Sequence, residues 1–239
     1  MFDLRPVGYV IGLLVCALGV TMLAPLLADL VAGNGHWPAF LESAVITILS
    51  GGFIALSCAN GVSSGLSIRQ TFMLTTLVWF TLPLFGSLPF MLGATEASFT
   101  DAFFEAMSGL TTTGSTVIVG LDDLPDGLKL WRGVLQWLGG IGIIVVAMVF
   151  LPELRVGGMQ IFRSESFDTM GKILPRATEI SSNISVIYVG ITLAAALAYA
   201  ATGMNAFDAL VHAMTTVATG GMANYDSSFA QFGAGTLYV

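Results

Sequence analysis

The sequence predicts an all-α membrane protein in which two additional spans precede repeated units of a span, a short re-entrant helix and a second span. The composition is 55% hydrophobic and only 10% charged, whereas a water-soluble domain carries about a quarter charged residues. Several apolar runs are long enough to cross about 30 Å of hydrocarbon as a helix. Two shorter apolar segments also recur at a fixed separation, which indicates an internal duplication.

Five apolar runs have the length of a membrane-spanning helix, which is roughly 20 residues. They cover residues 7–28, 40–59, 72–92, 130–151 and 184–201. The first is too long for the core of a signal peptide, and no cleavage site follows it before a soluble domain. Cys16 and Cys58 fall inside two of the runs without the spacing of metal ligands, so we interpret them as packing or lipid-facing residues.

Basic residues gather in the segments expected on one side of the membrane. These residues are Arg5, Arg69, Arg155, Arg163, Lys172 and Arg176, against Lys129 and Arg132 on the other side. The positive-inside rule therefore predicts a cytoplasmic N-terminus and a cytoplasmic linker at 152–180. The opposite side is acidic and would attract cations. Its acidic residues are Asp29, Glu42, Glu96, Asp101, Glu105, Asp122, Asp123, Asp126, Asp208 and Asp226.

The duplication appears when the sequence is displaced by 107 residues. Segments 98–110 and 205–217 then superpose without a gap, and Asp101, Met107, Thr112 and Gly114 meet identical residues. Both segments are too short to cross a bilayer, so we expect re-entrant half-helices. Ser98 and Asn205 are candidate N-caps, since each precedes an aspartate by three residues. The negative C-terminal ends would point into the membrane, where they favour a cation.

Each half-helix is followed by a string of threonine and glycine, TTTGS at 111–115 and ATGG at 218–221. Non-helical backbone is tolerated at membrane depth only where it lines an aqueous cavity or is packed within protein. Glycine permits the required turns, and backbone carbonyls can replace the water around a dehydrated cation. Taken alone, either string is also typical of a small-residue contact between helices. The candidate ion ligands are Thr111, Thr112, Thr113, Gly114, Thr219, Gly220 and Gly221.

Four stretches resemble the membrane subunit of the Trk family of bacterial potassium-uptake systems, which is related to the Ktr and plant HKT transporters. They are MSGLTTTG at 107–114, LQWLGGIG at 135–142, VGGMQIFR at 156–163 and TGGM at 219–222. The resemblance implies a potassium-channel-like pore of four span–loop–span units, each with a filter strand centred on a glycine. Gly114 and Gly221 match two of these glycines. Potassium would then be the transported ion, with no organic cofactor on this chain.

The resemblance also implies an organisation. Residues 1–64 would form two peripheral spans, 65–151 the first unit, 152–178 a cytoplasmic linker, and 179–239 a second unit up to its pore loop. Since this gives two of four filter segments, we expect the N-terminal half of a longer protein. The family implies a bacterial inner-membrane location, a homodimer when full length, and a cytosolic nucleotide-binding regulatory subunit that docks near the linker. Lipid headgroups explain the basic linker equally well, and no nucleic acid is expected.

Two other classes of protein compete with this interpretation. Asp122, Asp123 and Asp126 spell the DDxxD pattern with which membrane prenyl-transfer enzymes hold magnesium, but Pro125 and Gly127 predict a turn there and no second acidic cluster follows. We therefore expect no enzyme. The other alternative is a secondary transporter with re-entrant hairpins for an organic solute. Such sites usually contain an intramembrane charge, and the spans carry none away from their ends. His212, which pairs with Glu105 in the duplication, is expected to make a polar contact at the rim.

Overall fold

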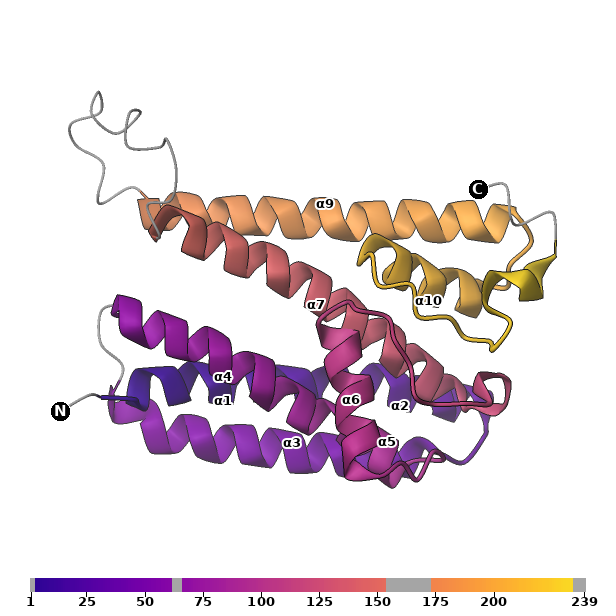
Figure 1. Ribbon diagram of the computed structural model, residues 1–239, viewed down its shortest axis with the longest axis horizontal. Helices are drawn as coiled ribbons and strands as arrows, with labels where there is room; N and C mark the ends of the chain where they lie inside the picture. The colour runs from indigo at the N-terminus through magenta and orange to yellow at the C-terminus, as the bar shows by residue number, and fades with distance from the viewer. Residues whose placement is uncertain (1–2, 62–65, 154–172, 234–239) are drawn as a thin grey trace.

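The computed structural model describes residues 3–61, 66–153 and 173–233, and within these residues every regular element is a helix (Figure 1). The long helices are α1 (Arg5–Thr21), α3 (Trp37–Cys58), α4 (Ile68–Gly86), α7 (Asp126–Glu153) and α9 (Ile173–Ala201). The shorter ones are α2 (Leu23–Ala32), α5 (Leu88–Leu92), α6 (Phe99–Leu110) and α10 (Ala206–Val217), with 3-10 turns η1 (Ala59–Gly61), η2 (Leu121–Asp123) and η3 (Ser228–Phe232).

The described residues contain four helical stretches long and apolar enough to cross a membrane. They are Arg5–Ala32, Trp37–Cys58, Arg69–Leu92 and Asn183–Ala201. The remaining expected span, 130–151, lies within α7, which is 28 residues long. Their outer faces expose large apolar side chains such as Phe53, Leu56 and Leu197, as contact with lipid requires. The predicted all-α membrane architecture is therefore confirmed.

Two of the spans are broken at prolines. α1 gives way to α2 at Met22, because Pro25 has no N–H to donate to the carbonyl four residues earlier and its ring would clash with that carbonyl. The same reasoning places the break between α4 and α5, since Pro89 lies in the first turn of α5. Each stretch remains one span with a break near its C-terminal end.

The N-terminal helices form a layer held together by small residues. A Cβ on Gly12 would lie 2.5 Å from the Ala55 nitrogen, and one on Gly51 would lie 2.7 Å from the Cys16 nitrogen. α1 and α3 therefore approach at backbone distance, as small residues allow in membrane helices. Cys16 Sγ donates to the Ile48 carbonyl at 3.5 Å, and both cysteines are free thiols, in agreement with a packing role.

Helix α7 crosses between this layer and the pair α9 and α10 (Figure 1), and it contacts α2, α6, α9 and α10. Its side chain Trp131 is fully buried, with Nε1 donating to the Gly86 carbonyl at 2.9 Å and its ring edge-on to Phe40. The end of α7 and the beginnings of α1, α4 and α9 lie at one end of the molecule in Figure 1. The beginning of α7 and the end of α9 lie at the opposite end.

Asp29 was grouped with the acidic residues of one side of the membrane, and its full burial was not predicted. Its Oδ1 accepts hydrogen bonds from the Gly127 nitrogen and from Asn34 Nδ2, both at 2.7 Å. A carboxylate at the start of a helix satisfies free N–H groups and opposes the positive end of the helix dipole. Asp29 thus fixes the N-terminal layer to the first turn of α7.

Replacing Asp29 by alanine is expected to lower the free energy of unfolding by about 1–3 kcal/mol, because it leaves the buried Gly127 N–H without an acceptor. Thermal unfolding of the purified full-length gene product in detergent measures the change. Asp123→Ala removes an exposed carboxylate nearby and serves as the control. Equal melting temperatures for the two variants would contradict the capping role.

Residues 154–172 of the predicted cytoplasmic linker at 152–178 lie outside the described residues. They include the 156–163 motif, Arg155, Arg163 and Lys172. The positions of the expected regulatory contact are therefore not described.

Candidate functional site

The two half-helices have the bounds that the duplication predicts, since α6 and α10 each contain 12 residues and their ends differ by the same displacement. Ser98 Oγ accepts from the Asp101 nitrogen at 3.2 Å, and Asn205 Oδ1 accepts from the Asp208 nitrogen at 2.9 Å. Figure 1 shows α10 running back along part of α9 before the chain returns to the end from which it came. The expected re-entrant helices are present.

The segments after the half-helices, residues 111–115 (the first loop) and 218–222 (the second loop), have the same backbone conformation. Both begin with a Schellman turn, in which a residue just past the helix adopts the left-handed conformation. The N–H of Thr113 donates to the Ser108 carbonyl at 2.9 Å, and the N–H of Gly220 donates to the Thr215 carbonyl at 3.0 Å. The left-handed residues are Thr112, with φ of 56°, and Thr219, with φ of 60°.

Glycine normally occupies this left-handed position, and a β-branched residue there is strained by about 1–3 kcal/mol. The strain occurs at two equivalent positions of the repeat. Gly114 and Gly221 are also left-handed, with φ of 81° and 72°. The chain leaves the helical path at the same residue in both units and continues without regular structure.

The two loops lie next to each other, although the duplication separates them widely in the sequence. A Cβ placed on Gly114 would overlap the carbonyl oxygen of Gly220. None of the seven candidate ligands is buried: Thr113, Thr219 and Gly221 are exposed, and the other four are partly exposed. The half-helices behind them supply buried core residues such as Ala106 and Ala213. The candidate ligands therefore form one accessible strip over a packed support.

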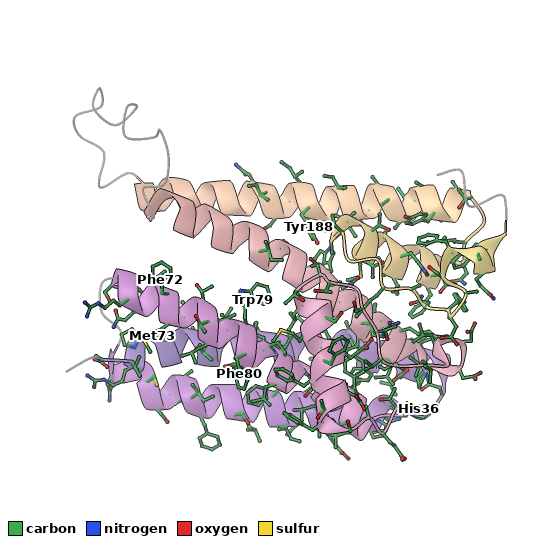
Figure 2. The ribbon with its side chains drawn as sticks, viewed as in Figure 1. His36, Phe72, Met73, Trp79, Phe80 and Tyr188 are labelled. Carbon is green, nitrogen blue, oxygen red and sulfur yellow. The ribbon has the colours of Figure 1, made fainter. Side chains whose placement is uncertain are left out.

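Helix α7 provides that support through the glycine pair of the 135–142 motif. A Cβ on Gly139 would overlap the Leu110 carbonyl at the end of α6, and one on Gly140 would lie 3.2 Å from the Ala218 Cα at the end of α10. Gly139 thus allows the end of α6 to pack directly against α7, and Gly140 allows the same for the end of α10. Tyr188, on the side of α9 that faces α7 (Figure 2), donates to the Trp137 carbonyl at 3.2 Å and joins α9 to the same helix.

Gln136 lies on α7 directly behind the two loops and is fully buried. Its Oε1 accepts from the Met222 nitrogen at 3.1 Å, and a Cβ on Gly220 would overlap its carboxamide. The side chain fixes the end of the second loop against α7. The sequence analysis did not identify Gln136 as a site residue, although a polar residue inside an apolar run was a usable signal.

A buried ion pair was also missed. Glu105 is fully buried and Arg132 is 2% exposed, with Arg132 Nε and Glu105 Oε1 2.8 Å apart. Glu105 was grouped with the acidic residues of one side of the membrane, and its burial against Arg132 was not predicted. Arg132 is the third residue of the predicted span 130–151, so it lies near the end of that span. The two charges satisfy each other, so this pair leaves no unpaired charge for an organic solute.

His212 was expected at a polar rim, and the structure contradicts this because the imidazole is fully buried. The turn η3 covers it, with Phe229 and Phe232 edge-on at centroid distances of 5.1 and 5.3 Å. Its Nδ1 donates to the Asp208 carbonyl at 2.8 Å. The imidazole is therefore part of an aromatic cluster.

Asp208, another of the acidic residues assigned to that side of the membrane, is also buried. Its carboxylate accepts from Asn224 Nδ2 at 2.7 Å and from the Tyr225 hydroxyl at 2.8 Å. Burial, followed by the hydrogen bond to Asp208, raises the pKa of Tyr225 to about 12. The tyrosine hydroxyl thus remains a donor at neutral pH, and the segment after the second loop is tied to its own half-helix.

The three aspartates of the DDxxD pattern do not share a helix face. Asp122 and Asp123 belong to η2, whereas Asp126 begins α7. Asp122 Oδ2 accepts from the Asp226 nitrogen, and Asp226 Oδ1 accepts from the Leu121 nitrogen, both at 3.1 Å. These carboxylates connect the segments that follow the two loops. The arrangement that diphosphate chemistry requires is not formed.

Membrane-length helices, two matching half-helices and their adjacent loops define a class of protein: a multi-pass membrane protein built from span–half-helix–span units. The TrkH family, described as cation transport proteins, matches residues 36–238, and the chain belongs to this family. The resemblance to Trk proteins is thereby confirmed.

Individual relatives agree with the family assignment. The Trk system potassium uptake protein TrkI of Halomonas elongata is 46% identical over 227 residues, which are 95% of this chain and 46% of that protein. TrkH of Escherichia coli K12 is 40% identical over 237 residues, which are 98% of this chain and 49% of that protein. The crystal structure of the potassium transporter TrkH from Vibrio parahaemolyticus superposes with a TM-score of 0.84 at 36% identity, covering 98% of this chain and 47% of that one. The chain spans about half the length of the curated relatives it matches.

Proposed function

We propose that this chain supplies two of the four filter segments of a potassium uptake pathway in the bacterial inner membrane. Backbone carbonyls in the two loops would take the place of the ion's water shell. The proposed ligands are Thr111, Thr112, Thr113, Gly114, Thr219, Gly220 and Gly221. The relatives named as potassium uptake proteins support potassium as the ion.

The observation that carries the proposal is the same strained turn occurring twice, side by side, on an accessible strip. The C-terminal end of each half-helix carries a partial negative charge of about half an electron, which favours a cation nearby. The loops offer carbonyl and hydroxyl oxygens without a formal charge, so an ion could bind and still leave. A strained threonine at each left-handed position keeps a hydroxyl beside this path, which glycine would not provide.

The assembly and the topology are further parts of the proposal. The chain would consist of two peripheral spans at 1–64, a first unit at 65–151, a linker at 152–178 and a second unit at 179–239. A second half of the same design would complete the pathway. The N-terminus and the linker would face the cytoplasm, where a nucleotide-binding regulatory subunit would dock. The full-length protein would be a homodimer. The alternation of helix ends in Figure 1 supports placing the N-terminus and the linker on one side.

The test is functional complementation. We expect the full-length gene product to restore growth at low external potassium in cells that lack their own potassium uptake, and to mediate rubidium influx that external potassium inhibits. Immunodetection in the membrane fraction establishes that the protein is inserted. A correctly inserted protein that neither restores growth nor carries rubidium would overturn the proposal in favour of organic-solute transport.

A further inference from the structure

We propose that Arg132 is a positioning residue that sets the preference for potassium over sodium, by linking the segments that leave the two filter loops. This inference rests on the proposed function, because it concerns the same pathway. The guanidinium of Arg132 is buried, and Arg132 is not one of the proposed ion ligands. Arg132 contacts neither loop ligand directly and acts through other groups.

Arg132 donates in two directions. Its Nε donates to Glu105 Oε1 at 2.8 Å, and its Nη1 donates to the Ala223 carbonyl at 2.6 Å. Ala223 directly follows the second loop, whose last N–H, that of Met222, is bonded to Gln136 one turn further along α7. The guanidinium therefore holds the outer end of the second loop against α7.

Glu105 carries the connection to the first loop. Its carboxylate accepts from Thr116 Oγ1 at 2.9 and 3.0 Å and from the Val117 nitrogen at 3.1 Å. Thr116 and Val117 directly follow the first loop. The segments that follow the two loops, beginning at Thr116 and at Ala223, are called the exit segments. Arg132 joins both of them, through the Glu105 carboxylate to the first and directly to the second. The planar fork of arginine suits such a two-way link, whereas a lysine ammonium acts as a single point of charge.

The two repeats differ at the position of Glu105, which indicates that its bond to Arg132 has a role specific to the first unit. The residue equivalent to Glu105 is His212, which faces Phe229 and Phe232 and has no bond to an arginine in the part of the chain that the structure describes. The second unit ties its exit segment to Asp208 instead. A link built from Glu105 and Arg132 therefore serves the junction between the two units, and a copy within each unit is not needed.

Fixed separation between the loops is what ion preference requires. A carbonyl ring sized for potassium discriminates against the smaller sodium ion only while the strands resist closing around it. The loops already touch at Gly114 and Gly220, so small shifts in one are transmitted to the other. We therefore expect loss of the link to affect ion preference more than the amount of inserted protein.

The test compares rubidium and sodium influx per inserted molecule in the full-length gene product. The variants are Arg132→Lys, Arg132→Gln and the double change Glu105→Gln with Arg132→Gln. The single change to glutamine leaves Glu105 buried without its partner, so it can reduce insertion; the double change removes both charges and restores the amount of protein. Arg132→Lys keeps the charge but reaches only one of the two partners. We expect roughly a tenfold fall in the rubidium-to-sodium ratio for both the lysine variant and the double variant, the size typical of coupling between neighbouring groups.

Asp226→Ala is the matched control. It removes another connection between the segments that follow the two loops, the hydrogen bond from the Leu121 nitrogen to the exposed Asp226 carboxylate, and it keeps the bond from the Asp226 backbone nitrogen to Asp122. Its ratio should stay near that of the parent. A parental ratio in both the lysine and the double variant would overturn the inference and assign Arg132 a merely structural role. Absence of rubidium influx in the parent itself would instead refute the proposed function.

Discussion

Gly114→Ser is expected to reduce the preference for rubidium over sodium by the largest factor of any single change in the loops. Gly114 has φ of 81°, and a side chain in the left-handed region costs about 1–2 kcal/mol. A Cβ there would also overlap the Gly220 carbonyl oxygen, which is itself a proposed ligand. The substitution therefore displaces carbonyls of both loops at once. Influx of the two ions, measured per inserted molecule of the full-length gene product, reports the change.

Gly120→Ser separates the effect of left-handed backbone strain from the effect of the overlap with the second loop. Gly120 has φ of 74°, close to that of Gly114, but nothing lies within 4 Å of a Cβ built on it. It thus carries the same backbone strain without the contact between loops. We expect the Gly120 variant to keep the parental ratio of rubidium to sodium influx. Equal relative uptake of both ions by the Gly114 variant and the parent would count against the filter assignment.

The duplication made the half-helices predictable in detail. Local signals decide these elements: Ser98 and Asn205 cap the first turn through bonds within three residues, and the threonine–glycine strings end the helices. Because these signals involve residues that are close in the sequence, the bounds of α6 and α10 agree with the expected segments. The spans were predictable for a similar reason, because length and apolarity depend on the run itself.

The buried polar residues were not predictable in the same way. Asp29, Glu105 and Asp208 were all assigned from the sequence to one acidic side of the membrane, and their burial was not predicted. Asp29 and Glu105 meet donors from distant parts of the chain, the Gly127 nitrogen and Arg132 respectively. Asp208 meets Asn224 and Tyr225, which follow its own half-helix. Burial of a carboxylate depends on such a partner, and a single sequence does not state which segments meet. The same limit applied to Gln136, whose partner is a backbone N–H of the second loop.

The glycine pair of α7 gives the other large expected effect. Gly139→Val places a branched side chain where the Leu110 carbonyl lies, at the end of α6. Because that carbonyl belongs to backbone, the obstruction is relieved only by moving α6 or α7. Overpacking of this kind costs about 1–3 kcal/mol or more, and the first loop moves with the end of α6. We expect a lower melting temperature of the purified full-length gene product and a loss of rubidium influx.

Gly142→Val is the control for this experiment, since Gly142 lies on the same helix and a Cβ there has nothing within 4 Å. Each variant replaces one glycine of α7 by valine, so the change in helix propensity is the same in both. The contact with α6 is what distinguishes them. If Gly139→Val and Gly142→Val melt at the same temperature and transport rubidium equally, close packing of the half-helix against α7 does not position the first loop.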